Sequence, residues 1–127
     1  MNPLKATMQA ASAGMQRETQ RLGLASENIS NADTPGYRRK LMVGTAPISG
    51  SEAFQAARIA LDETAGALEY DPAHPLANGE GYVTGSNVSL VIELADMREA
   101  NRSYEANLNA FQQARTMYKS LLDVLRR

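Results

Sequence analysis

The sequence of 127 residues contains no cysteine and no tryptophan, and aromatic residues make up only 6% of it. Without cysteine, the chain can form neither disulfides nor thiolate metal sites. Because large side chains are scarce, we expect any single core to be thin. The chain is too short for two cores and has no internal repeat, which predicts one domain, or one domain with a small insertion.

A strong net charge and long hydrophobic runs are also missing. The formal net charge is −1, so no sequence-wide field attracts nucleic acid or an anionic membrane surface, and we expect no nucleic-acid partner. No apolar run exceeds three residues, which argues against a transmembrane helix and against the apolar part of a secretory signal. We therefore expect no direct membrane insertion and, if the protein leaves the cytoplasm, export without a cleaved signal peptide.

A seven-residue repeat near the N-terminus predicts the first helix. Alternating steps of four and three run from Leu4 to Ile29, with Glu18 as the one polar exception. Asn2 is suited to the N-cap and Pro3 to the first helical position. The predicted seam residues of this helix are Leu4, Met8, Met15, Leu22 and Ile29.

A second repeat runs from Leu90 to Leu125 and predicts a helix of roughly 55 Å. Asn101 is either tolerated near solvent or fixes the register of the pair, and we favour register. The aliphatic stem of Arg115 is expected to lie along the seam while its guanidinium group reaches water. The predicted seam and assembly residues are Leu90, Leu94, Met97, Asn101, Tyr104, Leu108, Phe111, Tyr118, Leu121, Leu122 and Leu125.

The two repeats predict long terminal helices that pair as a coiled-coil-like rod. They could form a private hairpin. From residue 117 onward, however, apolar residues cover more of the circumference than one partner helix can hide. Ala6, Ala10, Ala13 and Gly14 form a further small-residue face. We therefore favour assembly with other molecules over a private hairpin.

The middle of the chain loses the helical period and gains glycine, proline and serine. Asn87 or Ser89 can cap the last helix. The predicted fold class is mainly α, with a discontinuous helical domain and a small β-rich insertion. The helical domain comprises residues 1–36 and 88–127, the insertion comprises 37–87, and the strands are expected at 37–43, 54–61, 67–70 and 81–84.

The segment "NADTPGY" predicts the stop of the first helix. Asn31 and Asp33 bond readily to nearby backbone, and Pro35 with Gly36 suits the centre of a type II turn. A lone glycine would also end a helix, so the full string indicates a further role. The turn motif comprises Asn31, Ala32, Asp33, Thr34, Pro35, Gly36 and Tyr37.

No residue pattern indicates catalysis. His74 is the only histidine and has no cysteine beside it for a metal site, so we expect a solvent-facing loop residue. Residues 79–85 lack the spacing of a phosphate-binding loop. We therefore predict no enzyme activity, and no catalytic, cofactor-binding or metal-binding residues.

Charged residues near the two helices have simpler interpretations. Glu93, Asp96 and Glu99 complement the dipole of the last helix, and as catalytic carboxylates they would need a pocket that nothing in the sequence predicts. The cluster at residues 38–40, "RRK", could bind phosphate, but solvation or an ion pair between subunits is favoured.

Three segments together resemble the axial proteins of the bacterial flagellum. "ASENISNADTPGYRRK" is similar to the signature that follows the first helix in rod and hook proteins. "YDPAHPLANGEGYV" and "RSYEANLNAFQQARTMYKSLLDVL" resemble the segments before and within the last helix of short proximal rod proteins. Residues 44–68 are unmatched. Ser89 stands where the family commonly has an acidic residue but can still cap the helix.

The resemblance implies a structural subunit of the flagellar basal-body rod, located in the periplasm. Such a subunit is exported by the flagellar type III apparatus and assembles helically with copies of itself and other rod proteins. It transmits torque from motor to hook. The alternative is a cytoplasmic coiled-coil adaptor or export chaperone, which would share the seams without needing the turn motif or the β-rich insertion.

Overall fold

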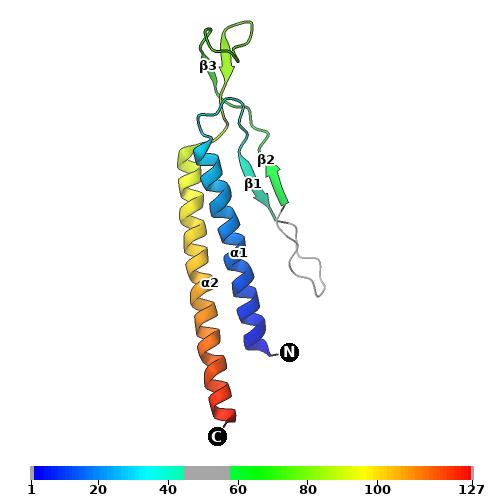
Figure 1. The fold of residues 1–127 in the computed structure, drawn as a ribbon, viewed down its shortest axis with the longest axis vertical. Helices are drawn as coiled ribbons and strands as arrows, with labels where there is room; N and C mark the ends of the chain where they lie inside the picture. The colour runs from blue at the N-terminus through cyan, green and yellow to red at the C-terminus, as the bar shows by residue number, and fades with distance from the viewer. Residues whose placement is uncertain (1, 45–57, 127) are drawn as a thin grey trace.

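The structure, a computed structural model, describes residues 2–44 and 58–126. Two long antiparallel helices, α1 (Pro3–Ser30) and α2 (Leu90–Leu125), lie side by side and form a rod-shaped molecule (Figure 1). Two small β-ribbons connect them in the sequence. The predicted fold class is confirmed, and both helices span the residues that the seven-residue repeats predicted.

Both helices begin as local chemistry predicts, although only one has a side-chain cap. The Asn2 side chain accepts a hydrogen bond from the backbone N–H of Leu4 at 2.9 Å, and Pro3 occupies the first turn. Ser89 is the N-cap of α2, but its side chain makes no capping bond. Its carbonyl instead accepts from the backbone N–H of Glu93 at 3.0 Å.

The predicted turn after α1 is present. The backbone N–H of Tyr37 donates to the carbonyl of Thr34 at 3.1 Å, with Pro35 and Gly36 between them. Gly36 has φ +74°, the left-handed value that the third position of a type II turn requires. The chain therefore leaves the helix pair through a turn that demands glycine at this point.

The insertion contains two antiparallel ribbons, and one strand lies within each of the four predicted ranges, although residues 37–39, 67 and 81 of those ranges are not part of a strand. β1 (Lys40–Val43) pairs with β2 (Arg58–Leu61), and Lys40 lies opposite Leu61. β3 (Leu68–Tyr70) pairs with β4 (Tyr82–Thr84), and Leu68 lies opposite Thr84. Residues 54–57 of the predicted second strand lie outside the described residues. The ribbon of β1 and β2 lies beside α1, whereas the ribbon of β3 and β4 forms the end of the molecule farthest from both termini (Figure 1).

Small residues make up the buried apolar core. Apart from Val83, its members are the alanines Ala11, Ala25, Ala100 and Ala114. The helices also approach closely at Gly14, where a Cβ atom would lie 2.7 Å from Nδ2 of Asn107. Gly14 therefore belongs to the contact within the chain, and the core is thin, as the scarcity of large side chains predicts.

The face of α2 that contacts α1 differs from the predicted seam at alternate positions. Met97, Tyr104, Phe111 and Tyr118 are half-buried, as a seam position requires. At the steps between these four residues, the residue that faces α1 lies one position earlier in the sequence than the one that the apolar repeat predicts. The resulting face, in steps of four and three, is Glu93, Met97, Ala100, Tyr104, Asn107, Phe111, Ala114 and Tyr118.

The physical reason for this difference is size. Ala100 and Ala114 are buried and let the helices approach, whereas their predicted counterparts Asn101 and Arg115 are exposed. The polar side chain between the helices is Asn107, so Asn101 does not set the register of this pair. Among the predicted seam residues, Leu108 is half-buried, and those exposed on the single chain are Leu90, Leu94, Leu121, Leu122 and Leu125.

On α1 the predicted phase agrees with the observed burial. Ala11, Glu18 and Ala25, which belong to the same repeat, are buried. The predicted seam residues Leu4, Met8, Met15, Leu22 and Ile29 are half-buried. The inward face of α1 is thus the one that its repeat marks.

Candidate assembly surfaces and the polar cluster that positions them

The described part of the chain, residues 2–44 and 58–126, contains no group of acidic and histidine side chains that could hold a metal ion. Within the same residues, neither helix combines the length and apolarity needed to cross a membrane. His74 lies in the loop between β3 and β4, where its Nδ1 accepts the backbone N–H of Leu76 at 3.0 Å. It is half-buried there and organises the loop.

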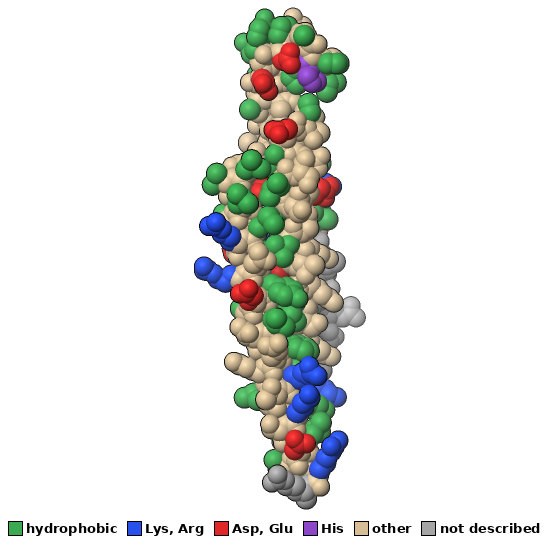
Figure 2. All heavy atoms as spheres, turned by 60° about the vertical axis from the view of Figure 1, so that its left-hand side comes forward, with side chains coloured by type: hydrophobic (Ala, Val, Ile, Leu, Met, Phe, Trp, Pro, Cys, Tyr) green, Lys and Arg blue, Asp and Glu red, His purple; other side chains and the backbone are tan. Residues whose placement is uncertain are grey.

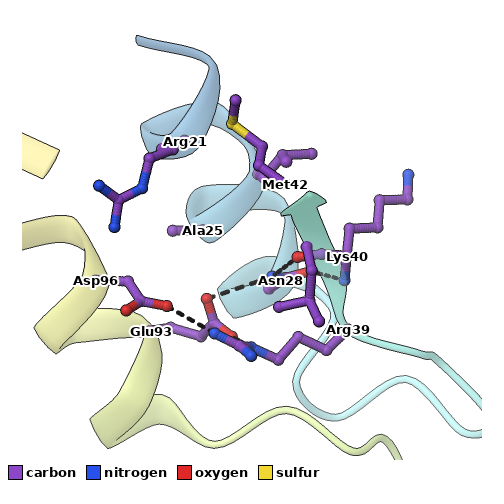
Figure 3. Close-up of a pocket in the computed structure, with 10 residues that line it drawn as sticks. Arg21, Ala25, Asn28, Arg39, Lys40, Met42, Glu93 and Asp96 are labelled. Carbon is purple, nitrogen blue, oxygen red and sulfur yellow. Dashed lines mark hydrogen bonds and ion pairs between the residues drawn. The ribbon is translucent and has the colours of Figure 1, made fainter. Parts of the chain in front are cut away.

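A polar cluster of Asn28, Arg39, Glu93 and Asp96 joins α1, β1 and α2 near the turn (Figure 3). Asn28 pairs with the backbone of Lys40 in both directions. Its Oδ1 accepts the Lys40 N–H at 3.0 Å, and its Nδ2 donates to the Lys40 carbonyl at 3.0 Å. The amide side chain thus replaces a neighbouring strand and fixes β1 against α1.

Glu93 is the most buried charge of the cluster, with a relative exposure of 1%. Its carboxylate accepts from Nε of Arg39 and from Nδ2 of Asn28, the latter at 3.3 Å. The guanidinium of Arg39 also reaches Asp96, with 2.6 Å between its terminal nitrogen and Oδ2. Because Glu93 lies in the first turn of α2, the helix dipole favours its negative charge as well. The forked side chain of Arg39, the residue directly before β1, therefore fixes the start of this strand to α2.

Tyr37, the last residue of the turn motif, is tied to the same cluster. Its hydroxyl donates to Oδ1 of Asn28 at 2.9 Å. Burial raises the pKa of Tyr37, and the nearby negative charge of Glu27 raises it further. The folded chain therefore favours the neutral, hydrogen-bonding phenol.

The basic residues of "RRK" make contacts within the chain, which corrects the expectation of solvation or a pairing between subunits. Arg39 pairs with Glu93 and Asp96, and Lys40 pairs with Glu27 of α1. The hydrogen bond from Lys40 to Glu27 raises the pKa of the lysine. Only Arg38 is exposed, and its Nε donates to the carbonyl of Asp62 at 3.1 Å. The turn brings β1 back against α1 and α2, so that acidic side chains of both helices lie within reach of Arg39 and Lys40.

The cluster lines a hollow of about 140 Å³, but the charges around it already satisfy one another (Figure 3). Among the described residues, no buried side-chain nitrogen or oxygen lacks a hydrogen-bond partner. A ligand site would present groups that still need a partner. The hollow is therefore part of the structural joint.

The turn motif is bonded to the segment that leads into α2, a role that the sequence did not reveal. The backbone N–H of Gly36 donates to the carbonyl of Thr84 at 3.0 Å, and the N–H of Asn87 donates to the carbonyl of Tyr37 at 3.3 Å. The hydroxyl of Ser86 donates to the carbonyl of Ala32, which also belongs to the turn motif. The exit from α1 and the entry to α2 thus form one hydrogen-bonded joint.

Asn87 completes this joint. Its Oδ1 accepts the backbone N–H of Arg39 at 2.6 Å, and its Nδ2 donates to the carbonyls of Asp62 and Thr64 at 3.0 and 2.9 Å. Asp62 in turn accepts the backbone N–H of Thr64, and hydrogen bonding from Thr64 lowers the pKa of Asp62. The sequence indicated Asn87 only as a possible cap of α2.

The C-terminal segment, residues 115–126, comprises the last turns of α2 and its C-cap, and its end reaches beyond the start of α1 (Figure 1). Nζ of Lys5, in the first turn of α1, lies 5.8 Å from the ring centre of Tyr118, which places Tyr118 near the start of α1. Large apolar side chains stay exposed there: Met117, Leu121, Leu122, Val124 and Leu125, with Leu125 at 72%. The segment is an apolar surface that this chain does not cover.

The tip of the molecule, residues 68–84, also exposes apolar side chains. Leu68, Tyr70 and Leu76 are each about two-thirds exposed, at 64%, 65% and 65%. The rings of Tyr70 and Tyr82 meet edge to face with centres 5.3 Å apart. The oxygen of the Asn78 side chain accepts from two backbone N–H groups of the loop. Hydrogen bonds therefore hold these apolar groups in place at the surface.

Comparison with known proteins places the chain in a class. Residues 8–38 match the family model described as flagella basal body rod protein, and residues 80–124 match the model described as flagellar basal body rod FlgEFG protein C-terminal. The two matched segments contain most of α1 with the turn motif and most of α2. The fold and these matches define a structural protein of the flagellar basal-body rod.

Individual relatives specify the member. The chain is 41% identical to the flagellar basal-body rod protein FlgC of Agrobacterium fabrum, across 99% of this chain and 98% of the relative. It is 30% identical to FlgC of Borreliella burgdorferi, across 96% and 97%, and 31% identical to FlgC of Escherichia coli O157:H7, across 84% and 87%. The chain belongs to the FlgC family of flagellar basal-body rod proteins. The recognition made from the three sequence segments is confirmed, and the adaptor or chaperone alternative is not favoured.

Proposed function

We propose that this rod subunit assembles helically with copies of itself and with other rod proteins, and that the assembly carries torque from the motor to the hook. The observation that carries the proposal is the apolar C-terminal segment, which extends past α1 with Leu121 and Leu125 exposed. Covering such a surface is favourable at about 25 cal/mol per Å² of apolar area. A neighbouring subunit supplies that cover.

The geometry of such a contact between subunits would produce a filament. A contact between two different surfaces that does not close into a ring continues as a helix. The predicted seam residues that face outward, among them Leu90 and Leu94, supply further apolar area along α2. Packed helices deform little, so the assembled array is stiff enough to transmit rotation. No catalytic step is part of this function.

The turn motif and the polar cluster set the direction in which the insertion leaves the helices. Asn28, Arg39 and Asn87 tie β1 to both helices and to the segment before α2. We assign the helices to an inner layer of the rod and the β-ribbons to its outside. The division into a helical domain of residues 1–36 and 88–127 and an insertion of residues 37–87 belongs to this proposal.

The proposal also includes the location of the rod in the periplasm and export by the flagellar type III apparatus without a cleaved signal. This part is supported by the relative in Agrobacterium fabrum, which is named a flagellar basal-body rod protein. Replacing the chain in a motile host by a tagged version and fractionating the cells tests it. The intact chain is expected in purified basal bodies, with its N-terminus retained. Accumulation in the cytoplasm of motile cells would contradict it.

Substitution in the C-terminal segment tests assembly. Leu121→Asp places a charge on an exposed apolar site, so it is expected to leave the free chain folded but to abolish rods and swimming. Gln113→Asp, at an exposed polar position of the same helix, is the matched control and is expected to swim. Leu108→Asp and Phe111→Asp are also expected to abolish motility, through the helix pair as well as through assembly. Normal swimming of the Leu121→Asp strain would refute the assignment.

A further inference from the structure

The two ends of the molecule carry opposite charge. Between Arg58 and Arg98 the sequence contains no lysine or arginine. The tip, residues 68–84, lies in this interval and presents the exposed carboxylates Glu69, Asp71 and Glu80. Figure 2 shows acidic side chains at one end of the rod together with exposed apolar side chains.

The C-terminal segment is basic. Arg115, Lys119 and Arg126 are exposed there, with Asp123 as the one acidic residue among them. Figure 2 shows blue side chains gathered toward this end of the molecule. The same segment carries the exposed apolar residues described above, so each end combines an apolar surface with charges of one predominant sign.

These two surfaces cannot meet within one chain. The tip and the C-terminal segment lie at opposite ends of the rod, separated by the length of α2 (Figure 1). A contact between them therefore joins two molecules. Complementary charge around an apolar centre is the arrangement that steers association and fixes its direction.

We propose that the acidic tip of one copy docks on the basic C-terminal segment of a second copy, end to end. Leu76 and the Tyr70–Tyr82 pair supply the apolar centre on one side, and Leu121 with Leu125 supplies it on the other. The tip is suited to this role because its loop is already ordered: the backbone N–H of Asp71 bonds to the carbonyl of Gly81 at 2.9 Å, and Asn78 fixes the turn. Little ordering entropy is then lost on docking.

The inference deepens the proposed function, since the partner is another copy of the rod subunit and the surfaces are named. It also predicts a salt effect. Raising NaCl from about 0.1 M to about 1 M shortens the Debye length from about 10 Å to about 3 Å and weakens attraction between exposed charges. Self-association of the full chain, measured by sedimentation velocity, is expected to weaken at least about tenfold over this range.

Charge reversal at each end gives the decisive experiment. Glu69→Lys with Glu80→Lys makes the tip basic, and Lys119→Glu with Arg126→Glu makes the C-terminal segment acidic. Each double variant alone is expected to associate at least about tenfold more weakly than the original chain, because its two ends then repel. An equal mixture of the two variants is expected to associate again, because the reversed tip of one matches the reversed C-terminal segment of the other.

The control is Arg98→Glu with Arg102→Glu, which makes the same change in net charge as the C-terminal double variant, at exposed positions of α2 away from both ends. It is expected to leave self-association unchanged, and circular dichroism checks that all variants stay helical. Failure of the mixture to associate, or equal weakening by the control, overturns the inference. So does binding of the C-terminal segment to anionic phospholipid vesicles in preference to a second copy.

The outcome is separable from that of the proposed function. If Leu121→Asp abolishes rods while charge reversal at the tip leaves both association and swimming intact, the end-to-end contact is refuted and the rod function stands. If Leu121→Asp strains swim normally, the proposed function fails whatever the sedimentation result.

Discussion

The side chain of Asn28 on α1 pairs with both backbone groups of Lys40 on β1, accepting from its N–H and donating to its carbonyl, each at 3.0 Å. The same nitrogen reaches Glu93 of α2 at 3.3 Å. One amide thereby connects three elements that are far apart in the sequence. It has to be an amide, because the position needs an acceptor and a donor at once.

Asn28→Asp is expected to destabilise the chain by about 3 kcal/mol, because it turns a donor into an oxygen that faces the Lys40 carbonyl and the Glu93 carboxylate. Urea unfolding followed by circular dichroism measures the change. Asn101→Asp, at an exposed position of α2, makes the same chemical change and is expected to stay within about 0.5 kcal/mol. Equal effects of the two would show that the Asn28 contacts do not stabilise the fold.

Arg39→Lys is expected to destabilise the fold by about 2 kcal/mol, because one ammonium cannot reproduce the fork that serves Glu93 and Asp96 together. The neighbouring substitution Arg38→Lys is the control. Arg38 is exposed and makes one bond to a backbone carbonyl, so its replacement is expected to cost less than about 0.5 kcal/mol. Thermal unfolding of both variants measures the two losses of stability. A larger loss for Arg38→Lys than for Arg39→Lys would show that the contacts of Arg39 with Glu93 and Asp96 do not stabilise the fold.

Gly23→Ala is expected to stabilise α1 by roughly 0.5–1 kcal/mol, since a Cβ there meets nothing within 4 Å and alanine favours a helix. Gly14→Ala is expected to lose that gain, because its Cβ would lie 2.7 Å from Nδ2 of Asn107. Asn107 would have to move and give up its bond to the carbonyl of Ser103.

Combining Gly14→Ala with Asn107→Ala removes the clash. The double variant is therefore expected to be more stable than the sum of the single effects predicts, which a double-mutant cycle on urea unfolding measures. Additive effects would show that the two residues do not limit the approach of the helices.

Ionisation of Tyr37 is expected to lower the free energy of unfolding at alkaline pH. Its pKa in the folded chain lies above the ordinary value of 10.0, chiefly through burial, so its contribution is complete below that pH and is lost as the pH rises through the raised pKa. Tyr37→Phe removes the hydroxyl bond to Asn28, is expected to cost about 1 kcal/mol at neutral pH, and is expected to flatten the alkaline loss. Unfolding free energies measured on both sides of pH 10 test this. An unchanged pH slope in the variant would assign the loss to other groups, such as Lys40, whose raised pKa acts with the same sign.

Local chemistry made the limits of the elements predictable. Asn2 and Pro3 mark the start of α1 by their own capping chemistry, and Pro35 with Gly36 marks the reversal after it. These signals depend on residues a few positions apart, so the sequence alone carries them. The long repeats likewise predicted that the terminal helices pair.

The contact face of α2 and the polar cluster could not be predicted in the same way. Counting apolar residues selects Leu94 and Leu108, whereas the observed steps pass through Glu93 and Asn107, because the narrow approach at Gly14 favours particular shapes over hydrophobicity. The inward position of Glu93 depends on its partner Arg39, which is 54 residues away in the sequence. Such a pairing exists only once the turn and both helices are in place.

Because α2 extends past α1, the residues that hold one molecule together and those that we propose contact its neighbours are largely different. Substitutions of exposed residues in the last turns of α2 are therefore expected to change the melting temperature of the single chain little, and a thermal screen would not detect their effect on assembly. Selection on this end of the chain is accordingly expected to act through the assembled organelle rather than through the solubility or half-life of the individual polypeptide.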